Sequence, residues 1–453
     1  MSPRNMQKIT NFGGNVSFTS KNLYTPATDQ EVLDILNKHQ SGQIKVLSSL
    51  HSWSEVTATS DVLIDLKKFK KIDLIEDQQG TTAEIGAGAT LQEILNHLRQ
   101  TSGYTLPTLG GIKKQTIAGA IATGTHGTGR PSLSHYIEEV RLAAYDPATG
   151  QAKIYKFNSG QELLAARCSL GCLGVILSVK IRLAEKYWMS EQAKKYDTLN
   201  EVLAKKDDFP LQQFALFPYS WKFYVYHRKI TDKPKSLLKI KLYKIYDYLV
   251  VEIFLHLLVK LFQQLGRGAI YWWWQKAVPR LLGQHQISGD SETILTLHTE
   301  HHYTFRHEEM EIFVPESNIF QAAEIIKKIT TDYANSGQYV HHYPIFFRYV
   351  LPEETLISMA SGNQPYYSVS FFTYRPPQKR QPYYDYTLEA AKTLVQKCQA
   401  RIHWGKRNPL SYNDLKHLYP NLEEFKQLCQ SVDPKGVFQN DYIRRVLGLE
   451  LNY

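Results

Sequence analysis

Residues 28–40 and 90–100 carry apolar side chains at every third or fourth position, with polar side chains between them. This spacing puts the apolar positions on one side of a helix and predicts two amphipathic helices, each with a buried side and a solvated side. Asp29 is the candidate N-cap of the first helix, and the second helix begins at Thr90.

Strands are predicted where apolar residues run together or alternate with polar ones. These runs cover residues 44–47, 62–66, 137–145, 152–157 and 174–183. The Asp-Pro-Ala-Thr-Gly sequence at 146–150 predicts a turn that joins the third and fourth runs as a hairpin. Because helices and strands are interleaved, the predicted fold class is α+β. The aromatic content rises after about residue 185, which indicates a domain boundary.

The segment 237–282 is strongly apolar and contains three consecutive tryptophans, Trp272–Trp274. A membrane-spanning helix requires about 20 mostly uncharged residues, and charged or polar residues interrupt this segment, so a simple span is not predicted. Two interpretations remain open. The segment forms amphipathic helices packed on the protein, or it forms an interfacial helix that contacts a membrane surface through tryptophans and flanking lysines. Those lysines are Lys235, Lys239, Lys241 and Lys244.

The chain has 453 residues, of which 43% are hydrophobic, and a formal net charge of +10. Its length allows two packed domains. The positive charge suits a pyrophosphate ligand or an anionic lipid surface, and no motif indicates a nucleic-acid partner. The four cysteines lack metal-ligand spacing and are expected to be buried free thiols, so no metal is predicted. The N-terminus has no apolar core segment, so we expect no cleaved signal peptide and a cytoplasmic or peripheral-membrane location.

Residues 109–129 read LGGIKKQTIAGAIATGTHGTG, a run of glycines and threonines around a short apolar stretch. Glycine lets the backbone approach a ligand closely, and backbone N–H groups with threonine hydroxyls form a cradle for a phosphate. The spacing differs from the Gly-x-Gly-x-x-Gly dinucleotide fingerprint, and the alternative is a glycine-rich surface loop. The candidate ligand-binding residues here are Gly110, Thr116, Gly119, Thr123, Gly124, Thr125, His126 and Gly127.

A second run of small polar residues, SSLHSWS at 48–54, follows the strand predicted at 44–47. Together the two loops resemble the FAD-binding domain of the vanillyl-alcohol-oxidase class of FAD-linked oxidases. Within that class the chain is most similar to the aldonolactone oxidases, such as the L-gulonolactone and D-arabinonolactone oxidases. Further matching segments lie at 11–15, 24–26, 83–91, 169–176, 309–315, 403–406 and 433–440. Of these, the His-Trp-Gly-Lys sequence at 403–406 is the most specific for the lactone-oxidase branch.

The resemblance implies FAD as cofactor, bound covalently through the imidazole of His51. It also implies contacts to FAD from Ser48, Ser49 and Ser52 in the same loop, and from Gly174 and Ile176 in the segment that closes over the flavin. The implied fold is a two-part FAD-binding domain with an α+β substrate cap. Residues 1–185 and the returning segment 403–453 would form the first, and residues 186–402 the second.

The implied reaction is the oxidation of a CH–OH group, with an aldono-1,4-lactone or related polyol as the leading substrate and with oxygen or another electron acceptor. FAD supplies the redox chemistry. Lys406 is expected to interact electrostatically with a substrate oxygen or with the flavin, and His403 to shape the pocket. Arg348 matches the arginine of the family's Glu-x-Arg pair, which orients the substrate.

Two positions depart from the family pattern. Phe346 stands where the family has the glutamate of the Glu-x-Arg pair, and Leu50 stands where it commonly has glycine, beside the histidine. Either the substrate lies differently, or it is less polar at this point, or another residue replaces the carboxylate. The candidates for such a replacement are Glu309, Glu311, His341 and His342. Two alternative functions follow: the same chemistry on a less polar alcohol, or a membrane-associated flavoprotein without lactone turnover.

Overall fold

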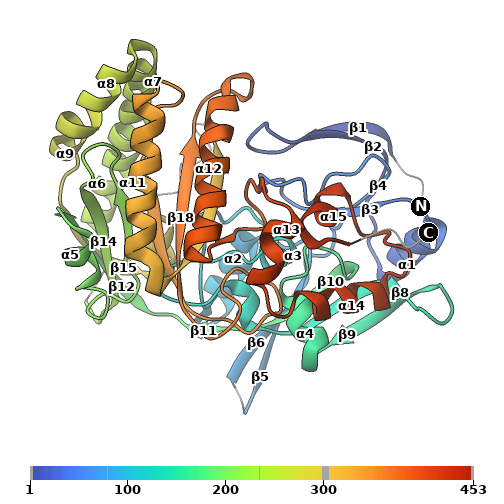
Figure 1. The fold of residues 1–453 in the computed structure, drawn as a ribbon. Helices are drawn as coiled ribbons and strands as arrows, with labels where there is room; N and C mark the ends of the chain where they lie inside the picture. Colours follow the sequence, from blue (N-terminus) through green and yellow to red (C-terminus); the bar gives the residue numbers. More distant parts are fainter. Residues whose placement is uncertain (1–3, 79, 234, 298–305, 450–453) are drawn as a thin grey trace.

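The computed structural model describes residues 4–78, 80–233, 235–297 and 306–449. Three sheets are formed by the first 185 residues (Figure 1). The order in the first is β1-β2-β4-β3, with β1 Arg4–Thr10, β2 Ser17–Tyr24, β3 Ile44–Leu47 and β4 Val62–Asp65. The order in the second is β5-β6-β10-β8-β9, with β5 Ile72–Asp77, β6 Gly80–Gly86, β8 Ile137–Tyr145, β9 Ala152–Phe157 and β10 Val175–Arg182. A two-stranded sheet pairs β7 Tyr104–Thr105 with β11 Ala184–Glu185.

These sheets confirm the predicted strands and the hairpin at 146–150. The two predicted helices are confirmed as α1 Asp29–Lys38 and α2 Leu91–Thr101. The prediction of Asp29 as N-cap was wrong, because the Thr28 side chain accepts the hydrogen bond from Glu31 N and Asp29 is already helical. Thr90 caps α2 in a capping box with Glu93. The other helices of this part are α3 Ile117–Ala122 and α4 Gly160–Arg167.

An eight-stranded antiparallel sheet, called the cap sheet here, follows in the order β15-β12-β14-β13-β17-β18-β16-β19. Its strands are β12 Trp188–Tyr196, β13 Gln213–Leu216, β14 Phe223–Ile230, β15 Gln286–Asp290, β16 Glu308–Pro315, β17 Ile345–Val350, β18 Tyr366–Thr373 and β19 Arg401–Ile402. In Figure 1, the long helices α11 Ile319–Asn335 and α12 Gln381–Cys398 lie side by side over one face. Short helices α5 Leu199–Leu203 and α10 Ser291–Thr296 lie at its outer strands.

Side chains alternate between the two faces of the cap sheet. Met310 and Phe347 belong to the core that includes the apolar residues of α11 and α12. The intervening positions Glu309, Arg348 and Phe372 face the other side, where they line a cavity. One face of the cap sheet therefore builds the core, and the opposite face presents polar side chains to a binding site.

The apolar segment 237–282 folds as two helical arms that meet at Gly266, whose φ is +91°. The first arm contains α6 Leu237–Tyr246, a π-helical stretch Asp247–Leu255 and α7 His256–Leu265. The second contains α8 Arg267–Trp272, a π-helical stretch Trp273–Ala277 and α9 Val278–Leu281. Trp273 and Trp274 are buried in a cluster with residues of β13 and β14, whereas Trp272 is exposed. The interpretation of all three tryptophans as a membrane belt was therefore wrong for two of them.

Within the described part of the chain, no helix is both long and apolar enough to cross a bilayer. The C-terminal helices α13 Tyr412–Leu415, α14 Leu422–Val432 and α15 Asp441–Leu447 return to the first two sheets (Figure 1). The Val437 carbonyl accepts a hydrogen bond from Ile44 N of β3 at 2.8 Å, and the Asn440 side chain donates to the Ala58 carbonyl at 2.9 Å. All four cysteines are buried and unbridged, as predicted.

Candidate active site

A cavity of about 420 Å³ lies between the loops that follow β3 and β7, helix α3, and the polar face of the cap sheet. Its lining includes nearly every residue that the sequence singled out. These are Ser48, Ser49, His51, Ser52, Gly110, Thr116, Gly119, Thr123, Thr125, His126, Gly174, Ile176, Arg348, His403 and Lys406. Two predicted binding residues, Gly124 and Gly127, lie outside this lining.

Gly124 and Gly127 have structural reasons to be glycine. Gly124 has a φ of +71°, and a Cβ there would lie 2.9 Å from the Met359 side chain. A Cβ on Gly127 would lie 2.6 Å from the Leu109 carbonyl oxygen. Both positions therefore require glycine for the conformation of the loop. From the sequence pattern alone, a glycine required for loop conformation could not be distinguished from one that contacts a ligand.

The two polar loops contact each other directly. Ser48 Oγ and Thr116 Oγ1 share a hydrogen bond of 2.7 Å, and Thr116 also caps α3 by accepting from Gly119 N. A Cβ on Gly119 would lie 2.4 Å from Ser48 Oγ. The close approach of the loops therefore requires glycine at position 119.

His51 is half-buried in the wall of this cavity. Burial, together with the positive charges of Lys114 and Lys406, lowers its pKa to about 4. Its imidazole is therefore neutral at physiological pH, the state in which a ring nitrogen is nucleophilic. The preceding Leu50 has a φ of +56°, in the left-handed region that favours glycine. This conformation explains in physical terms why glycine is common at this position in the resembling family.

Lys406 lies at the cap-sheet end of the cavity between two carboxylates. Its Nζ forms a short ion pair with Glu309 and lies 3.8 Å from Glu311 Oε2. The Nζ also lies 4.4 Å from the centre of the Trp53 ring, a cation–π contact. The lysine is thus held in one place by charge on one side and by an aromatic face on the other.

Glu311 is a fully buried carboxylate surrounded by cationic and imidazole groups. Its Oε1 lies 3.2 Å from His126 Nε2, and its Oε2 lies 3.9 Å from His403 Nε2. Burial favours the protonated form, but His126, Lys406 and His403 outweigh it and hold the pKa of Glu311 well below its ordinary value. Ligand atoms of His126, Glu311 and His403 lie within 4.8 Å of one another, close enough for a metal ion. The adjacent ammonium of Lys406 opposes such an ion by charge repulsion.

His403 has a defined tautomer. The Gly405 N–H donates to His403 Nδ1 at 3.0 Å, so the ring proton of the neutral form is on Nε2, which lies 3.9 Å from Glu311 Oε2. Burial lowers the pKa of His403 well below its ordinary value, and the attraction of Glu311 does not offset this. The imidazole is therefore a neutral hydrogen-bond donor.

Arg348 lines the cavity, and its Nε donates to Gln213 Oε1 at 3.4 Å. Phe346 lies on the same face of β17, and its ring packs against Phe372 with 5.8 Å between centroids. Phe372 lines the cavity, whereas Phe346 is not part of the lining.

Of the four candidates to replace the missing carboxylate, only Glu309 and Glu311 lie at the cavity. His341 and His342 are buried elsewhere, in the segment before β17, which begins at Ile345.

Sequence reasoning missed several residues of this site. Trp53 and Phe372 line it, as do Gln115 and the buried Lys45, whose Nζ donates to the Phe438 carbonyl at 3.0 Å. Trp53 was visible as the only aromatic residue within the SSLHSWS loop. Lys45 had a weaker signal, a lysine at the centre of an apolar strand.

The lining fits FAD. Hydroxyl groups and lysine side chains, which bind a pyrophosphate well, occur together with apolar side chains suited to ring systems. Gly110 and Gly119 leave stretches of wall without side chains. When bound, FAD supplies the ring that accepts a hydride from a CH–OH carbon.

Comparisons with known proteins agree with this geometry. The family model of the FAD binding domain matches residues 21–147, and that of D-arabinono-1,4-lactone oxidase matches residues 179–446. A long-chain alcohol oxidase from an uncultured marine euryarchaeote is 38% identical, with 96% of each chain covered. The L-gulonolactone oxidase of Bos taurus is 26% identical, with 97% of this chain and 98% of that protein covered.

The fold is shared more widely. The crystal structure of a cholesterol oxidase from B. sterolicum matches 98% of this chain and 97% of that chain, with a TM-score of 0.77 at 15% identity. The predicted α+β fold of the vanillyl-alcohol-oxidase type and the FAD cofactor are thereby confirmed. The chain therefore belongs to the D-arabinono-1,4-lactone oxidase family and is an FAD-linked oxidoreductase that acts on CH–OH groups.

Proposed function

We propose that the protein oxidises an alcohol with a long apolar carbon chain. The observation that carries this proposal is the Phe372 ring in the cavity wall, packed against Phe346, which stands where the family has a carboxylate. In the aldonolactone oxidases a carboxylate stands at the position of Phe346 and orients a polar substrate. The relative named a long-chain alcohol oxidase, at 38% identity, supports the same choice.

A row of packed aromatic rings runs from Phe372 in the cavity wall towards α7. Tyr343 packs against Phe372 at 5.8 Å, Tyr374 against Tyr343 at 4.7 Å, and His256 of α7 against Tyr374 at 4.1 Å between ring centroids. Removing a methylene from water stabilises binding by about 0.8 kcal/mol, whereas a hydroxyl without a partner there costs about 1–3 kcal/mol. This row of rings therefore favours methylenes over hydroxyls.

The polar groups at the cap-sheet end of the cavity bind the alcohol oxygen and accept its proton. His403 Nε2–H and the cations Lys406 and Arg348 stabilise that oxygen by hydrogen bonding and charge. Glu309 takes the hydroxyl proton as the carbonyl forms, and so replaces the carboxylate that position 346 lacks. The substrate thus lies between the cap sheet and the flavin-binding loops.

The test is anaerobic mixing of the FAD-loaded protein with a long-chain primary alcohol and, separately, with L-gulono-1,4-lactone. We expect the alcohol to bleach the flavin absorbance at least tenfold more efficiently than the lactone. Reoxidation in air with release of hydrogen peroxide would identify oxygen as an electron acceptor. Bleaching by the lactone alone would contradict the proposal, and no bleaching by either class would indicate a flavoprotein without alcohol turnover.

An aldono-1,4-lactone is the second candidate substrate, in keeping with the family model that matches residues 179–446. The polar trio of Glu309, Arg348 and Lys406 favours it, because a lactone presents several oxygens. Phe346→Glu separates the two candidates: it should raise kcat/KM for the lactone about tenfold or more and lower that for the alcohol. Phe320→Glu, at an exposed position on α11, is the matched control and should change neither.

We propose that His51 forms the covalent bond to FAD. Its neutral imidazole in the cavity wall supports this role. His51→Ala should release all flavin into the supernatant on acid precipitation, whereas the wild type should keep it in the pellet. A yellow pellet from the variant would contradict the assignment.

We also propose a peripheral membrane contact through the outer side of residues 237–282. Leu257, Leu261 and Leu265 recur every four residues along α7 and are 52%, 46% and 63% exposed. Further exposed apolar side chains on these helical arms are Leu237, Leu238, Leu242, Ile245, Leu249, Phe254 and Trp272. An apolar stripe of this size on an outer surface is typical of a contact site.

Replacing the α7 stripe by Leu257→Gln/Leu261→Gln/Leu265→Gln should weaken binding to phosphatidylcholine vesicles at least tenfold in a flotation assay. Ile154→Gln, at an exposed apolar position on β9, is the control and should not change binding. A wild type that never floats with vesicles would contradict the membrane contact.

A further inference from the structure

A second cavity, of about 690 Å³, opens beside α7 and is separate from the flavin cavity. It lies between α7, the loop before β2 and the loop that leads into α12. Its lining residues are Gly13, Gly14, Lys260, Gln263, Gln264, Arg306, Tyr374, Arg375, Pro376, Pro377, Lys379 and Arg380. We call this cavity the basic groove, because five of these residues are Lys or Arg and no described residue of the lining is acidic.

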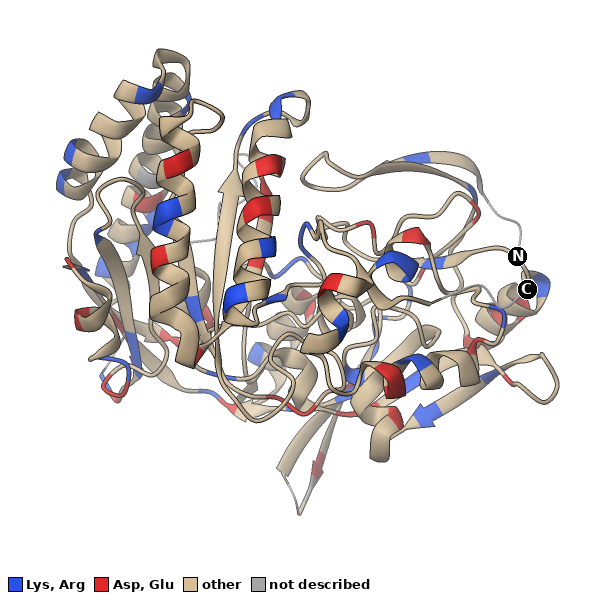
Figure 2. Ribbon diagram, in the orientation of Figure 1, with Lys and Arg blue, Asp and Glu red and all other residues tan. Residues whose placement is uncertain are grey.

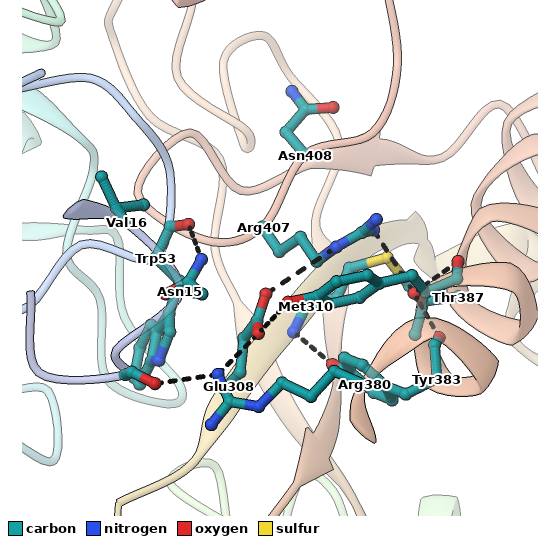
Figure 3. Close-up of polar contacts among 12 residues, drawn as sticks. Asn15, Val16, Trp53, Glu308, Met310, Arg380, Tyr383, Thr387, Arg407 and Asn408 are labelled. Carbon is teal, nitrogen blue, oxygen red and sulfur yellow. Dashed lines mark hydrogen bonds and ion pairs between the residues drawn. The ribbon is translucent and has the colours of Figure 1, made fainter. Parts of the chain in front are cut away.

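Arg380 at the bottom of the groove is already neutralised. Its Nη1 lies 2.9 Å from Glu308 Oε2 and donates to the Gly13 carbonyl at 2.8 Å (Figure 3). Arg407 Nε lies 3.7 Å from the other oxygen of Glu308. The single negative charge of Glu308 is thus shared by two arginines and does not neutralise the other cations of the groove.

Three of the other cations in the lining, Arg306, Arg375 and Lys379, form no ion pair with a carboxylate of the described residues. Arg306 and Lys379 are exposed, and no ion pair connects either of them to another described residue. Arg375 lies over the Tyr339 ring at 5.2 Å, a cation–π contact with a ring that carries no net negative charge. In Figure 2, the loop at the end of α12 nearest α7 carries blue segments. The groove therefore has an excess of positive charge that an anion would balance.

A polar donor also points to a ligand. Gln263 Nε2 is buried and has no hydrogen-bond partner among the described residues. A buried amide N–H without a partner costs about 1–3 kcal/mol, which an oxygen acceptor in the groove would offset.

Helix α7 connects the groove to the apolar stripe. Lys260, Gln263 and Gln264 line the groove, and Leu257 and Leu261 of the same helix are exposed to solvent. A molecule with an anionic end and apolar chains fits both surfaces at once. Helices that lie at a bilayer interface combine the same two features: apolar side chains enter the membrane, and neighbouring lysines extend their ammonium groups to the lipid headgroups.

We propose that the basic groove binds the phosphate headgroup of an anionic phospholipid, while the stripe on α7 contacts its acyl chains. This inference rests on the proposed membrane contact and adds a lipid class to it. It makes the protein selective for negatively charged membranes and orients it with the aromatic row of Tyr374 towards the bilayer.

The experiment compares vesicles of phosphatidylcholine with vesicles that also contain phosphatidylglycerol. We expect the wild type to bind the anionic vesicles at least tenfold more tightly, with the difference shrinking at high salt. The double variant Arg306→Gln/Lys379→Gln should lose most of this preference for anionic vesicles, since each cation near an anionic surface increases the binding affinity about fivefold. Lys397→Gln/Lys435→Gln removes the same charge at exposed positions outside the groove and is the matched control.

Equal losses in the two double variants would overturn the headgroup site and leave only general attraction by net charge. Displacement of the wild type from anionic vesicles by millimolar glycerol phosphate or inorganic phosphate would show a site for free phosphate, and would also overturn it. Equal binding to both kinds of vesicle would reject the lipid class and keep the apolar contact. Vesicle binding is measured without substrate, so a failure of the proposed oxidation would not affect this result.

Discussion

Lys406 shows how one side chain depends on several contacts made by other segments. Glu309 and Trp53, from β16 and the first polar loop, hold its ammonium beside the cavity. A charged group fixed in a site with little water stabilises a developing charge more strongly than a mobile one, because no reorganisation is needed.

Lys406→Met keeps most of the side-chain volume and removes the charge. We expect flavin reduction by the alcohol to slow about 100-fold or more, which is the usual effect of removing one preorganised group that stabilises charge in the transition state. The FAD content should stay unchanged. Stopped-flow absorbance under anaerobic conditions measures the reduction rate. Lys397→Met, at an exposed position outside the cavity lining, is the control and should reduce at the wild-type rate. An unchanged rate in Lys406→Met would remove this lysine from the reaction.

At the scale of secondary structure elements, the site depends on how closely two loops approach. Ser48, after β3, and Thr116, at the start of α3, are joined by a hydrogen bond, and Gly119 leaves room for Ser48. A methyl group at position 119 would have to displace one of the two loops that line the cofactor cavity.

Gly119→Ala should lower the free energy of unfolding by about 1–3 kcal/mol, the usual cost of overpacking, and should reduce the FAD content of the purified protein. Thermal unfolding and the ratio of flavin to protein absorbance measure the two effects. Gly103→Ala is the control, because a Cβ there meets no atom within 4 Å. Full flavin content and unchanged stability in Gly119→Ala would show that the loops separate without cost.

Elements with a local cause could be predicted from the sequence. Thr90 and Glu93 form a capping box within one helical turn, and the hairpin turn at 146–150 is equally local. The site required contacts between residues far apart in the chain. Glu311 meets His403 because β19 pairs with β16, and it meets His126 because the cap sheet lies against the loop after α3, neither of which a local pattern records. Similarly, Trp273 and Trp274 have the sequence of a membrane belt, and only packing against β13 and β14 shows that they are core residues.

For the whole molecule, the buried histidines couple stability to pH. Burial lowers the pKa of His227 to about 4 and those of His256 and His341 to about 3. Burial also lowers the pKa of His342 and of His403 well below the ordinary value. In the unfolded chain each of these imidazoles binds a proton below about pH 6.5. The unfolded state therefore binds more protons than the native state between about pH 6.5 and 4.

The free energy of unfolding should accordingly fall as the pH drops below 6.5, by about 1.4 kcal/mol per pH unit for each such histidine. Asp433 acts in the opposite direction, because burial raises its pKa to about 6 and the native state keeps its proton. Urea unfolding at pH 7, 6 and 5 measures the slope. His341→Gln should reduce the slope by one proton, whereas the exposed His417→Gln should not. A pH-independent stability over this range would contradict the assignment of neutral buried imidazoles.

The return of the C-terminus to β3 has a consequence for how the enzyme matures. Lys45 in the wall of the flavin cavity donates to the carbonyl of Phe438, which lies 393 positions later in the chain and also lines the cavity. During synthesis the earlier wall residues leave the ribosome long before this partner exists. The wall of the binding site is therefore incomplete until Phe438 has left the ribosome, so cofactor binding to the full site cannot guide the folding of the first sheets from the start.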